Sequence, residues 1–348
     1  MKAYRVAQFG FEHMELVDLA MPRPGPGQVL VRVEAVSLNY RDLLVVRGMY
    51  NPKMRLPRIP CSDGAGEIVE AGAGVAGFKA GDRVAGIFMQ RWLEGALTAE
   101  KSHQALGGDV DGMLAEYVVL DAGGVVRVPA HLSYTEASTL PCAAVTAWHA
   151  LAHAAKVKPG ETVLIQGTGG VSMFALQFAR MMGARVLGTS SSNEKIGRAR
   201  ALGLDGAVNY RERPDWAEWV LEQTGGEGVD AVIEVGGAGT FNQSLKAVRV
   251  GGTVAQIGVL SQATEAISVI PILHKQIHVQ GIYVGSRRMF EEMNAAISHA
   301  GLHPVVDRVY PFAEARTAME SMAAGSHLGK IVVAVGEAGD RRAMSPGL

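Results

Sequence analysis

The sequence predicts an α/β protein that combines a doubly wound parallel sheet with a second, β-rich and barrel-like domain. In the middle of the chain, short apolar segments alternate with helical ones, which is typical of a parallel sheet covered by helices on both faces. Six of the apolar segments are strand candidates, which fits a doubly wound dinucleotide-binding sheet. In the first third, short strand-like segments lie between glycine and proline turns, as in small barrels.

The elements of the parallel sheet can be placed from the apolar pattern. We expect helices between its strands at 171–182, 194–202, 216–224 and 241–250. The apolar stretch 140–155 contains a proline and two histidines and predicts a buried helix, because a membrane span needs about 20 clean apolar residues. The six strand candidates are 162–166, 185–188, 206–209, 229–234, 252–257 and 278–283.

The β-rich domain takes its segments from both ends of the chain. Residues 90–112 show no clear period and predict a loop with some helix. A final apolar strand at 331–335 is expected to return to the first domain, which is then discontinuous. The sequence therefore divides into residues 1–124 and 299–348 for this domain and 125–298 for the dinucleotide-binding domain. The other strand candidates of the β-rich domain are 29–36, 64–70, 81–86 and 115–120.

Length and charge exclude several classes of protein. A chain of 348 residues suggests about two domains. The formal net charge is −1, which argues against a nucleic-acid partner. Two cysteines cannot form a disulfide framework or a four-cysteine zinc site. With charges throughout the N-terminal segment and no spanning segment, we expect a cytoplasmic protein without a membrane partner.

The segment from Gln166 to Ser172, Gln-Gly-Thr-Gly-Gly-Val-Ser, is the most informative for chemistry. It stands where a strand ends and a helix begins, so its glycines let the backbone approach a pyrophosphate at the helix N-terminus. The match is imperfect, because Ser172 stands where a third glycine is expected. A purely structural turn is the alternative, but the strand–helix context favours a nucleotide site. The residues expected to contact it are Gly167, Thr168, Gly169, Gly170 and Val171.

The end of the second strand bears on the choice between NAD and NADP. An acidic residue there would bond the ribose 2′-hydroxyl, whereas this chain reads Gly-Thr-Ser-Ser-Ser-Asn-Glu-Lys over 188–195. The hydroxyls of Ser190 and Ser191 and the ammonium of Lys195 can accept a 2′-phosphate, and Tyr210 and Arg211 could complete the pocket. A serine-rich solvent loop is the alternative. The pattern favours NADP as the cofactor, with NAD possible.

With these pieces assembled, the chain resembles the medium-chain dehydrogenase/reductase superfamily over about residues 1–335, most closely its zinc-free, quinone oxidoreductase-like branch. The resemblance implies a GroES-like catalytic domain, a Rossmann domain and an active site in the cleft between them. It also implies a homodimer or homotetramer that pairs through the last Rossmann strand, near 276–284. The motifs that carry the resemblance lie at 25–33, 37–42, 60–72, 78–84, 158–167 and 200–210.

The resemblance assigns further residues to the cofactor. It implies that Asn39, Thr146 and the backbone near Gly258 and Val284 border the nicotinamide. Lys195 and Tyr210 match the positions that hold the adenosine phosphate in NADPH-specific relatives. The complete set of expected cofactor contacts outside the glycine turn is Asn39, Thr146, Ser190, Ser191, Lys195, Tyr210, Gly236, Gly258, Val259 and Val284.

The chain departs from the zinc-containing members of this superfamily. In zinc alcohol dehydrogenases a cysteine takes the position of Asn39, and Gly-His-Glu takes that of Cys-Ser-Asp at 61–63, so their histidine is Ser62 here. No cysteine lies between 90 and 112, where a structural zinc lobe would need four. We therefore expect no bound zinc, since Cys142 alone is a poor substitute. His149 and His153 share a helix face, but their spacing without a glutamate predicts a satisfied histidine pair.

Without a metal, the preferred substrate is one that accepts hydride readily. Quinones and α,β-unsaturated carbonyls do so, because the charge delocalises onto a remote oxygen that needs a hydrogen-bond donor. The candidate donors are Asn39, Tyr40 and Ser62. Thr146 is expected near the nicotinamide ring, and Asp42 is expected to orient a donor. For Tyr40, the alternative is a role in packing only. Two other functions stay open: a zinc-independent alcohol or aldehyde dehydrogenase, and a non-catalytic NADPH-binding module.

Overall fold

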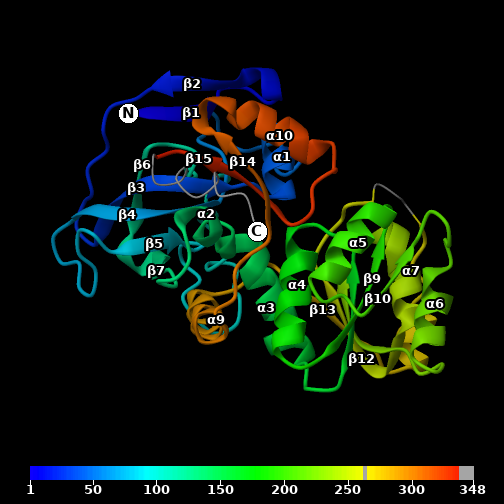
Figure 1. Cartoon of the computed structure of the whole chain (residues 1–348). Coiled ribbons are helices and arrows are strands. Elements are labelled where there is room, and N and C mark those ends of the chain that lie inside the picture. Colours follow the sequence, from blue (N-terminus) through cyan, green and yellow to red (C-terminus); the bar gives the residue numbers. More distant parts are fainter. Residues whose placement is uncertain (262–264, 337–348) are drawn as a thin grey trace. The chain divides into compact units, whose positions relative to one another are not determined.

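The computed structural model describes residues 1–261 and 265–336, which form two compact units (Figure 1). Of the described residues, the first comprises Met1–Val145 and those from Gly285 to Gly336, and the second comprises Thr146–Val284. These positions differ from the expected boundaries at 125 and 298. The reason is that β7 (Val125–Arg127) pairs with β5 (Arg83–Gly86) and that α9 (Arg287–Ala300) binds β7, with Asn294 Nδ2 donating to the Arg127 carbonyl.

The second unit contains a six-stranded parallel sheet in the order β10-β9-β8-β11-β12-β13. Numbered along the chain within this unit, the order is 3-2-1-4-5-6, which is that of a doubly wound dinucleotide-binding sheet. The predicted fold class is therefore confirmed. The strands are β8 (Thr162–Gln166), β9 (Arg185–Ser190), β10 (Gly206–Asn209), β11 (Val229–Glu234), β12 (Val248–Gln256) and β13 (His278–Gly281).

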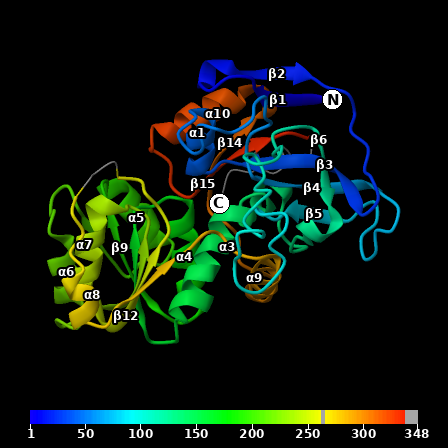
Figure 2. The same cartoon turned by 180° about the vertical axis from the view of Figure 1, so that it is seen from behind.

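Helices cover this sheet, with α4 on one side and α6 and α7 on the other (Figure 1). Alternate strand residues, including Leu164, Leu187 and Val232, form one apolar cluster with α6 and α7. The short helix α8 packs against α7 (Figure 2). The helices are α4 (Gly170–Met181), α5 (Asn193–Ala201), α6 (Trp216–Gln223), α7 (Ala238–Ala247) and α8 (Ile270–His274).

Two helical predictions need correction. The helix expected over 241–250 ends at Ala247, because Val248 already pairs with Val229 as the first residue of β12. The stretch 140–155 is not one α-helix. It is divided into η3 (Leu140–Ala144), α3 (Val145–Trp148) and η4 (His149–Ala155), with π-helical turns in η3 and η4. Among the helices of the described residues, none has the length and apolarity to cross a membrane.

The first unit is built on a seven-stranded sheet in the order β14-β15-β3-β4-β5-β7, with β6 also paired to β3. Only β14 and β15 run parallel. As expected, β15, the last strand of the described residues, returns to this unit and pairs with β3. The remaining strands of this sheet are β3 (Gln28–Ser37), β4 (Asp63–Ala71), β6 (Tyr117–Asp121), β14 (Val306–Pro311) and β15 (Lys330–Ala334).

Several elements of the first unit were not anticipated from the sequence. β1 (Lys2–Val6) and β2 (Met14–Asp18) form a separate antiparallel pair, and the short helix α1 (Tyr40–Val46) follows β3.

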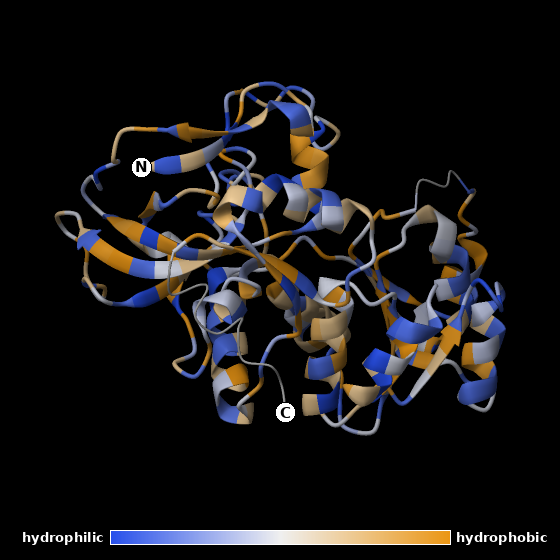
Figure 3. Cartoon of the chain, turned by 45° about the horizontal axis from the view of Figure 1, so that its top comes forward, coloured by the Kyte–Doolittle hydropathy of each residue, from blue (hydrophilic) through white to orange (hydrophobic). Residues whose placement is uncertain are grey.

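The helices of both units carry apolar and polar residues on the same ribbon, as expected for helices that cover a core (Figure 3). The remaining helical segments are η1 (Phe11–His13), η2 (Ala122–Gly124), α2 (Tyr134–Ala137), η5 (Phe312–Glu314) and α10 (Ala315–Ala323).

The register around β3 brings three distant segments together. Ser37, the last residue of β3, lies opposite Asp63 on β4 and opposite Val332 on β15. The chain beyond Ser37 therefore runs beside Ser62 on one side and Lys330 on the other. Gly329 makes the start of β15 possible: its φ is 80°, and a Cβ there would lie 2.4 Å from the Val305 carbonyl oxygen.

Candidate active site and nucleotide site

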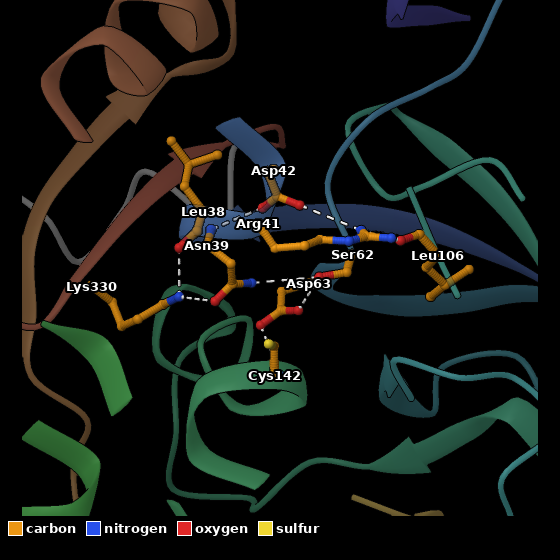
Figure 4. Close-up of polar contacts among 9 residues, drawn as sticks. All are labelled: Leu38, Asn39, Arg41, Asp42, Ser62, Asp63, Leu106, Cys142 and Lys330. Carbon is orange, nitrogen blue, oxygen red and sulfur yellow. Dashed lines mark hydrogen bonds and ion pairs between the residues drawn. The ribbon is translucent and has the colours of Figure 1, made fainter. Parts of the chain in front are cut away.

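Four polar side chains meet at this end of β3, and we call Asn39, Ser62, Asp63 and Lys330 the polar cluster (Figure 4). Lys330 Nζ donates to Asn39 Oδ1 at 2.6 Å and to the Leu38 carbonyl at 2.5 Å. Asn39 Nδ2 lies 3.5 Å from Ser62 Oγ, a long hydrogen bond, and Ser62 Oγ donates to Asp63 Oδ1 at 2.7 Å. All four are buried, with Asn39 8% and Lys330 3% exposed.

Asp63 is the acidic residue of the cluster. Its second oxygen accepts the backbone N–H of Cys142 at 3.0 Å. Burial raises the pKa of this carboxyl, while the Lys330 charge and the hydrogen bonds from Ser62 and Asn39 lower it. Burial likewise raises the pKa of the Cys61 and Cys142 thiols, so both are held in the neutral form.

Asp42 stands beside the cluster and orients Asn39. Asn39 is the N-cap of α1, and its backbone N–H donates to Asp42 Oδ2 at 2.8 Å, as in a capping box. The other oxygen, Oδ1, accepts no hydrogen bond from a described residue and lies 3.6 Å from Arg41 Nη1. Burial raises the pKa of Asp42 to about 6, and Arg41 limits the rise.

The structure separates the expected catalytic residues. It brings Asn39, Ser62 and Asp42 together, whereas Tyr40 is 39% exposed at the start of α1. Thr146 belongs to the second unit, where it is buried. Lys330 and Asp63 were not among the candidates. A lysine at the head of an otherwise apolar strand, Lys-Ile-Val-Val-Ala, is a signal that could have drawn attention to Lys330.

The polar cluster does not suit a zinc ion. Its groups are an amide, a hydroxyl and a carboxylate already bonded twice, next to a neutral thiol, and an ammonium is bonded directly to the amide. Zinc prefers thiolate and imidazole ligands, and a fixed ammonium repels it. Over residues 1–261 and 265–336, no group of three His, Cys, Asp or Glu side chains could hold a metal ion.

In the second unit, the glycine turn Gly167–Gly170 connects β8 to α4. Gly167 has a φ of 67°, and its N–H donates to the Thr189 carbonyl, so the turn is tied to the end of β9. A Cβ at Gly167 or Gly169 would meet no described atom within 4 Å. Open space therefore lies in front of the helix N-terminus, and its geometry fits a dinucleotide pyrophosphate.

Ser172 explains how the turn tolerates the missing third glycine. The side chain is buried, and its Oγ donates to the Gln166 carbonyl at 2.6 Å. The hydroxyl thus joins α4 to the end of β8. In the usual motif, a third glycine permits close packing at this place. The serine supports the turn and leaves the space in front of it unoccupied.

The adjacent loops are held by a carboxylate that the sequence analysis missed. Glu234 is fully buried at the end of β11, and Oε1 accepts the N–H groups of Gly236 and Gly237 at 2.8 and 2.9 Å. Its other oxygen accepts from Gln166 Nε2 at 2.7 Å. Gly258 lies next to this turn, and a Cβ there would stand 2.3 Å from the Val235 carbonyl oxygen. Only glycine fits at that position.

The end of β9 carries the expected adenosine-side residues. Ser190 is buried at the last position of the strand, and Ser191 follows it. The Tyr210 N–H donates to the Ser190 carbonyl, so the structure brings these two segments together. Lys195 lies in the first turn of α5, which Ser192 caps. Glu194 is exposed, and the Glu212 side chain accepts hydrogen bonds from Asn193 and Asn209.

Val284 has an unusual backbone. Its φ of 56° is rare for a β-branched residue, and the side chain is buried. The Val284 carbonyl bonds His149 Nδ1 at 2.8 Å, and burial lowers the pKa of His149, which fits a neutral donor. His149 therefore has a structural partner, and its ring meets His153 edge-on.

Val259 is another of the expected cofactor contacts. Its side chain is 71% exposed, whereas that of Val284 is buried.

Comparisons with known proteins agree with this architecture. Residues 25–130 match the family described as alcohol dehydrogenase GroES-like domain, and residues 170–299 match the family described as zinc-binding dehydrogenase. A zinc-type alcohol dehydrogenase-like protein of Schizosaccharomyces pombe is 44% identical over 94% of this chain and 96% of its own. An acryloyl-coenzyme A reductase of Metallosphaera sedula is 31% identical over 93% and 96%. A crystal structure of a putative alcohol dehydrogenase from Sinorhizobium meliloti superposes with a TM-score of 0.90 at 41% identity, over 96% of this chain and 98% of that one.

Proposed function

The chain belongs to the medium-chain dehydrogenase/reductase superfamily of oxidoreductases, and we propose that it is an NADPH-dependent, zinc-independent reductase of quinones or α,β-unsaturated carbonyls. The observation that carries the proposal is the polar cluster. At the position where zinc-containing relatives place metal ligands, this chain has Asn39 and Ser62, with the ammonium of Lys330 bonded to Asn39. Such a site offers hydrogen-bond donors and one fixed charge in place of a Lewis acid.

The second unit supplies the groups for NADPH. The glycine turn offers open space at the N-terminus of α4, and Glu234 supports the neighbouring Gly236 turn. At the adenosine end, hydroxyls and an ammonium occur where an NAD-specific site has a carboxylate, which supports the 2′-phosphate form. When bound, the reduced nicotinamide supplies the hydride.

The groups of the first unit suit an acceptor with delocalised charge. Hydride adds to the β-carbon of an enone, and the electron pair of the double bond moves onto the carbonyl oxygen. Asn39 Nδ2 is the donor we assign to that oxygen, because the amide nitrogen carries two hydrogens and its 3.5 Å contact with Ser62 is long. A solvent proton then adds to the α-carbon, which balances the reaction as alkene plus NADPH plus H⁺ to saturated product plus NADP⁺.

A screen of NADPH oxidation tests this function. The purified protein, analysed for zinc, is assayed with quinones, enones, aldehydes and alcohols, with either cofactor. We expect turnover of enones or quinones without zinc and a preference for NADPH. Turnover confined to simple aldehydes, or dependent on added zinc, would contradict the proposal. Binding of NADPH with no turnover on the whole panel would indicate a nucleotide-binding module.

A second candidate is an alcohol or aldehyde oxidoreductase. The names of the Schizosaccharomyces pombe relative and of the Sinorhizobium meliloti structure favour it. A simple ketone needs a stronger electrophile on its oxygen than an amide, and for that reason we rank this reaction second. The same screen separates the two, since alcohols with NADP⁺ or NAD⁺ are substrates only for the second candidate.

We further propose that the protein forms a homodimer through β13. This strand is at the edge of the sheet, all four of its residues are exposed, and it can pair with a second copy. Light scattering on the purified protein tests this, with Val279→Lys expected to yield monomers if the strand is the interface. A monomeric wild-type protein would contradict it. Large apolar side chains of β13 and of the chain just before it are exposed: Val259, Leu260, Ile267, Val269, Ile270, Leu273 and Val279.

A further inference from the structure

Lys330 is the least expected member of the polar cluster, since it is a lysine buried in the interior of the first unit, with only 3% of the residue exposed. An ammonium so placed is costly unless it is bonded. Two of its three hydrogens have partners, the Leu38 carbonyl and Asn39 Oδ1, both at short, charge-assisted distances. The hydrogen bond to Asn39 Oδ1 therefore stabilises the buried Lys330 ammonium and also fixes the Asn39 amide.

The two ends of the Asn39 amide are held very differently. Its oxygen accepts a charge-assisted bond of 2.6 Å, whereas its nitrogen contacts Ser62 at 3.5 Å and also bonds the Asp63 carboxyl. An ammonium can only donate, so it determines which end of the amide is the oxygen. The nitrogen then faces Ser62 and the Asp63 carboxyl, so the amide is held in orientation from both ends.

We propose that Lys330 is a positioning residue that holds the Asn39 amide with its N–H groups directed at the oxygen of the substrate. The proposal rests on the proposed reductase function. Lys330 acts through orientation and charge, because a fixed positive charge on the amide oxygen makes the N–H a stronger donor. Lys330 does not donate a proton to the substrate, because it contacts the amide oxygen of Asn39 and the amide would have to pass that proton on.

A double-mutant cycle tests this role. We compare wild type, Lys330→Met, Asn39→Ala and the double variant, with Lys79→Met as control because Lys79 is an exposed lysine of the same unit. Lys330→Met is expected to lower kcat about 10- to 100-fold, as loss of orientation does, and to leave the Kd for NADPH within about twofold. If Lys330 acts through Asn39, the double variant falls no further than Asn39→Ala alone.

Additive losses would overturn the proposal, because they mean that Lys330 and Asn39 act separately. A weaker Kd for NADPH with unchanged kcat would overturn it as well and would assign Lys330 to the nucleotide. Lys330→Gln, which retains a donor of similar reach, is measured in parallel in case the methionine variant does not fold. It should recover part of kcat if orientation matters.

A readout without turnover separates this inference from the proposed function. In protein labelled with ¹⁵N-asparagine, the side-chain signal of Asn39 is identified by its loss in Asn39→Asp. We expect Lys330→Met to shift that signal and to speed its hydrogen exchange, and Lys79→Met to leave both unchanged. An unchanged signal in Lys330→Met overturns the inference even if the enzyme is active. A shifted signal in a protein that reduces none of the acceptors supports the link to Asn39 and contradicts only the function.

Discussion

The polar cluster and the glycine turn are built in opposite ways. The polar cluster gathers side chains from three segments, around 39, 62 and 330, which meet only through the register of β3 with β4 and β15. The glycine turn is backbone within one short segment between β8 and α4. One region works by charge and hydrogen-bond direction, and the other by open space at the N-terminus of α4. Substitutions can therefore change one property at a time.

Asn39→Ala is the change with the largest expected effect. It removes the proposed donor to the substrate oxygen, and loss of one such donor lowers kcat about 100- to 1,000-fold. The Kd for NADPH should change much less than kcat, because the glycine turn is untouched and Asn39 is expected only at the nicotinamide end. Steady-state kinetics and fluorescence titration measure the two quantities. A large loss of nucleotide affinity with kcat preserved would show that the two regions do not divide the work in this way.

Asp42→Asn tests the electrostatics beside the cluster. The pKa of Asp42 is raised from 3.8 to about 6, so the folded protein binds this proton more tightly than the unfolded chain. Ionisation of Asp42 therefore reduces stability as the pH rises from 3.8 through about 6. Asp42→Asn removes that penalty and should be more stable than wild type by about 1–3 kcal/mol at pH 7.

Urea unfolding of both proteins at several pH values measures the difference. The advantage of Asp42→Asn should be largest above pH 6 and vanish below about pH 4, where Asp42 is protonated in both states. The asparagine keeps an acceptor for the Asn39 N–H, so the cap of α1 is retained. A difference that does not change with pH would mean that ionisation of Asp42 is not its source.

The same contrast explains what could be predicted from the sequence. The order of apolar strands and helices predicts the parallel sheet, and the glycine turn is visible because its residues are adjacent. Asn39, Ser62 and Asp42 were identified as candidates, but Lys330 was not, because nothing local links position 330 to position 39. Glu234 was missed for a similar reason: its partner Gln166 lies 68 residues away in the chain.

Gly169→Ala examines the glycine turn. The backbone at Gly169 has a φ of −75°, which alanine adopts without strain, and no described atom lies within 4 Å of the new Cβ. Stability should therefore be unchanged, while a methyl group in the pyrophosphate space should raise the Kd for NADPH about tenfold or more. Gly258→Ala is the contrasting variant, because its Cβ would strike the Val235 carbonyl and lower the melting temperature. Unchanged affinity in Gly169→Ala would place the pyrophosphate elsewhere.

Lys195→Ala has the smallest expected effect and tests the choice of cofactor. Lys195 lies at the first turn of α5, near the Ser190 and Tyr210 segments, where a 2′-phosphate would be bound. Removal of one ammonium from a partly exposed phosphate site should raise the Kd for NADPH about tenfold, ~1.4 kcal/mol, and leave that for NADH within about twofold. Lys158→Ala, at an exposed lysine of the same unit, controls for net charge. The loss should shrink at high salt, since an exposed ionic contact is screened. Equal losses for NADH and NADPH would mean that Lys195 does not read the phosphate, and the preference would then have to come from Ser190, Ser191 or Tyr210.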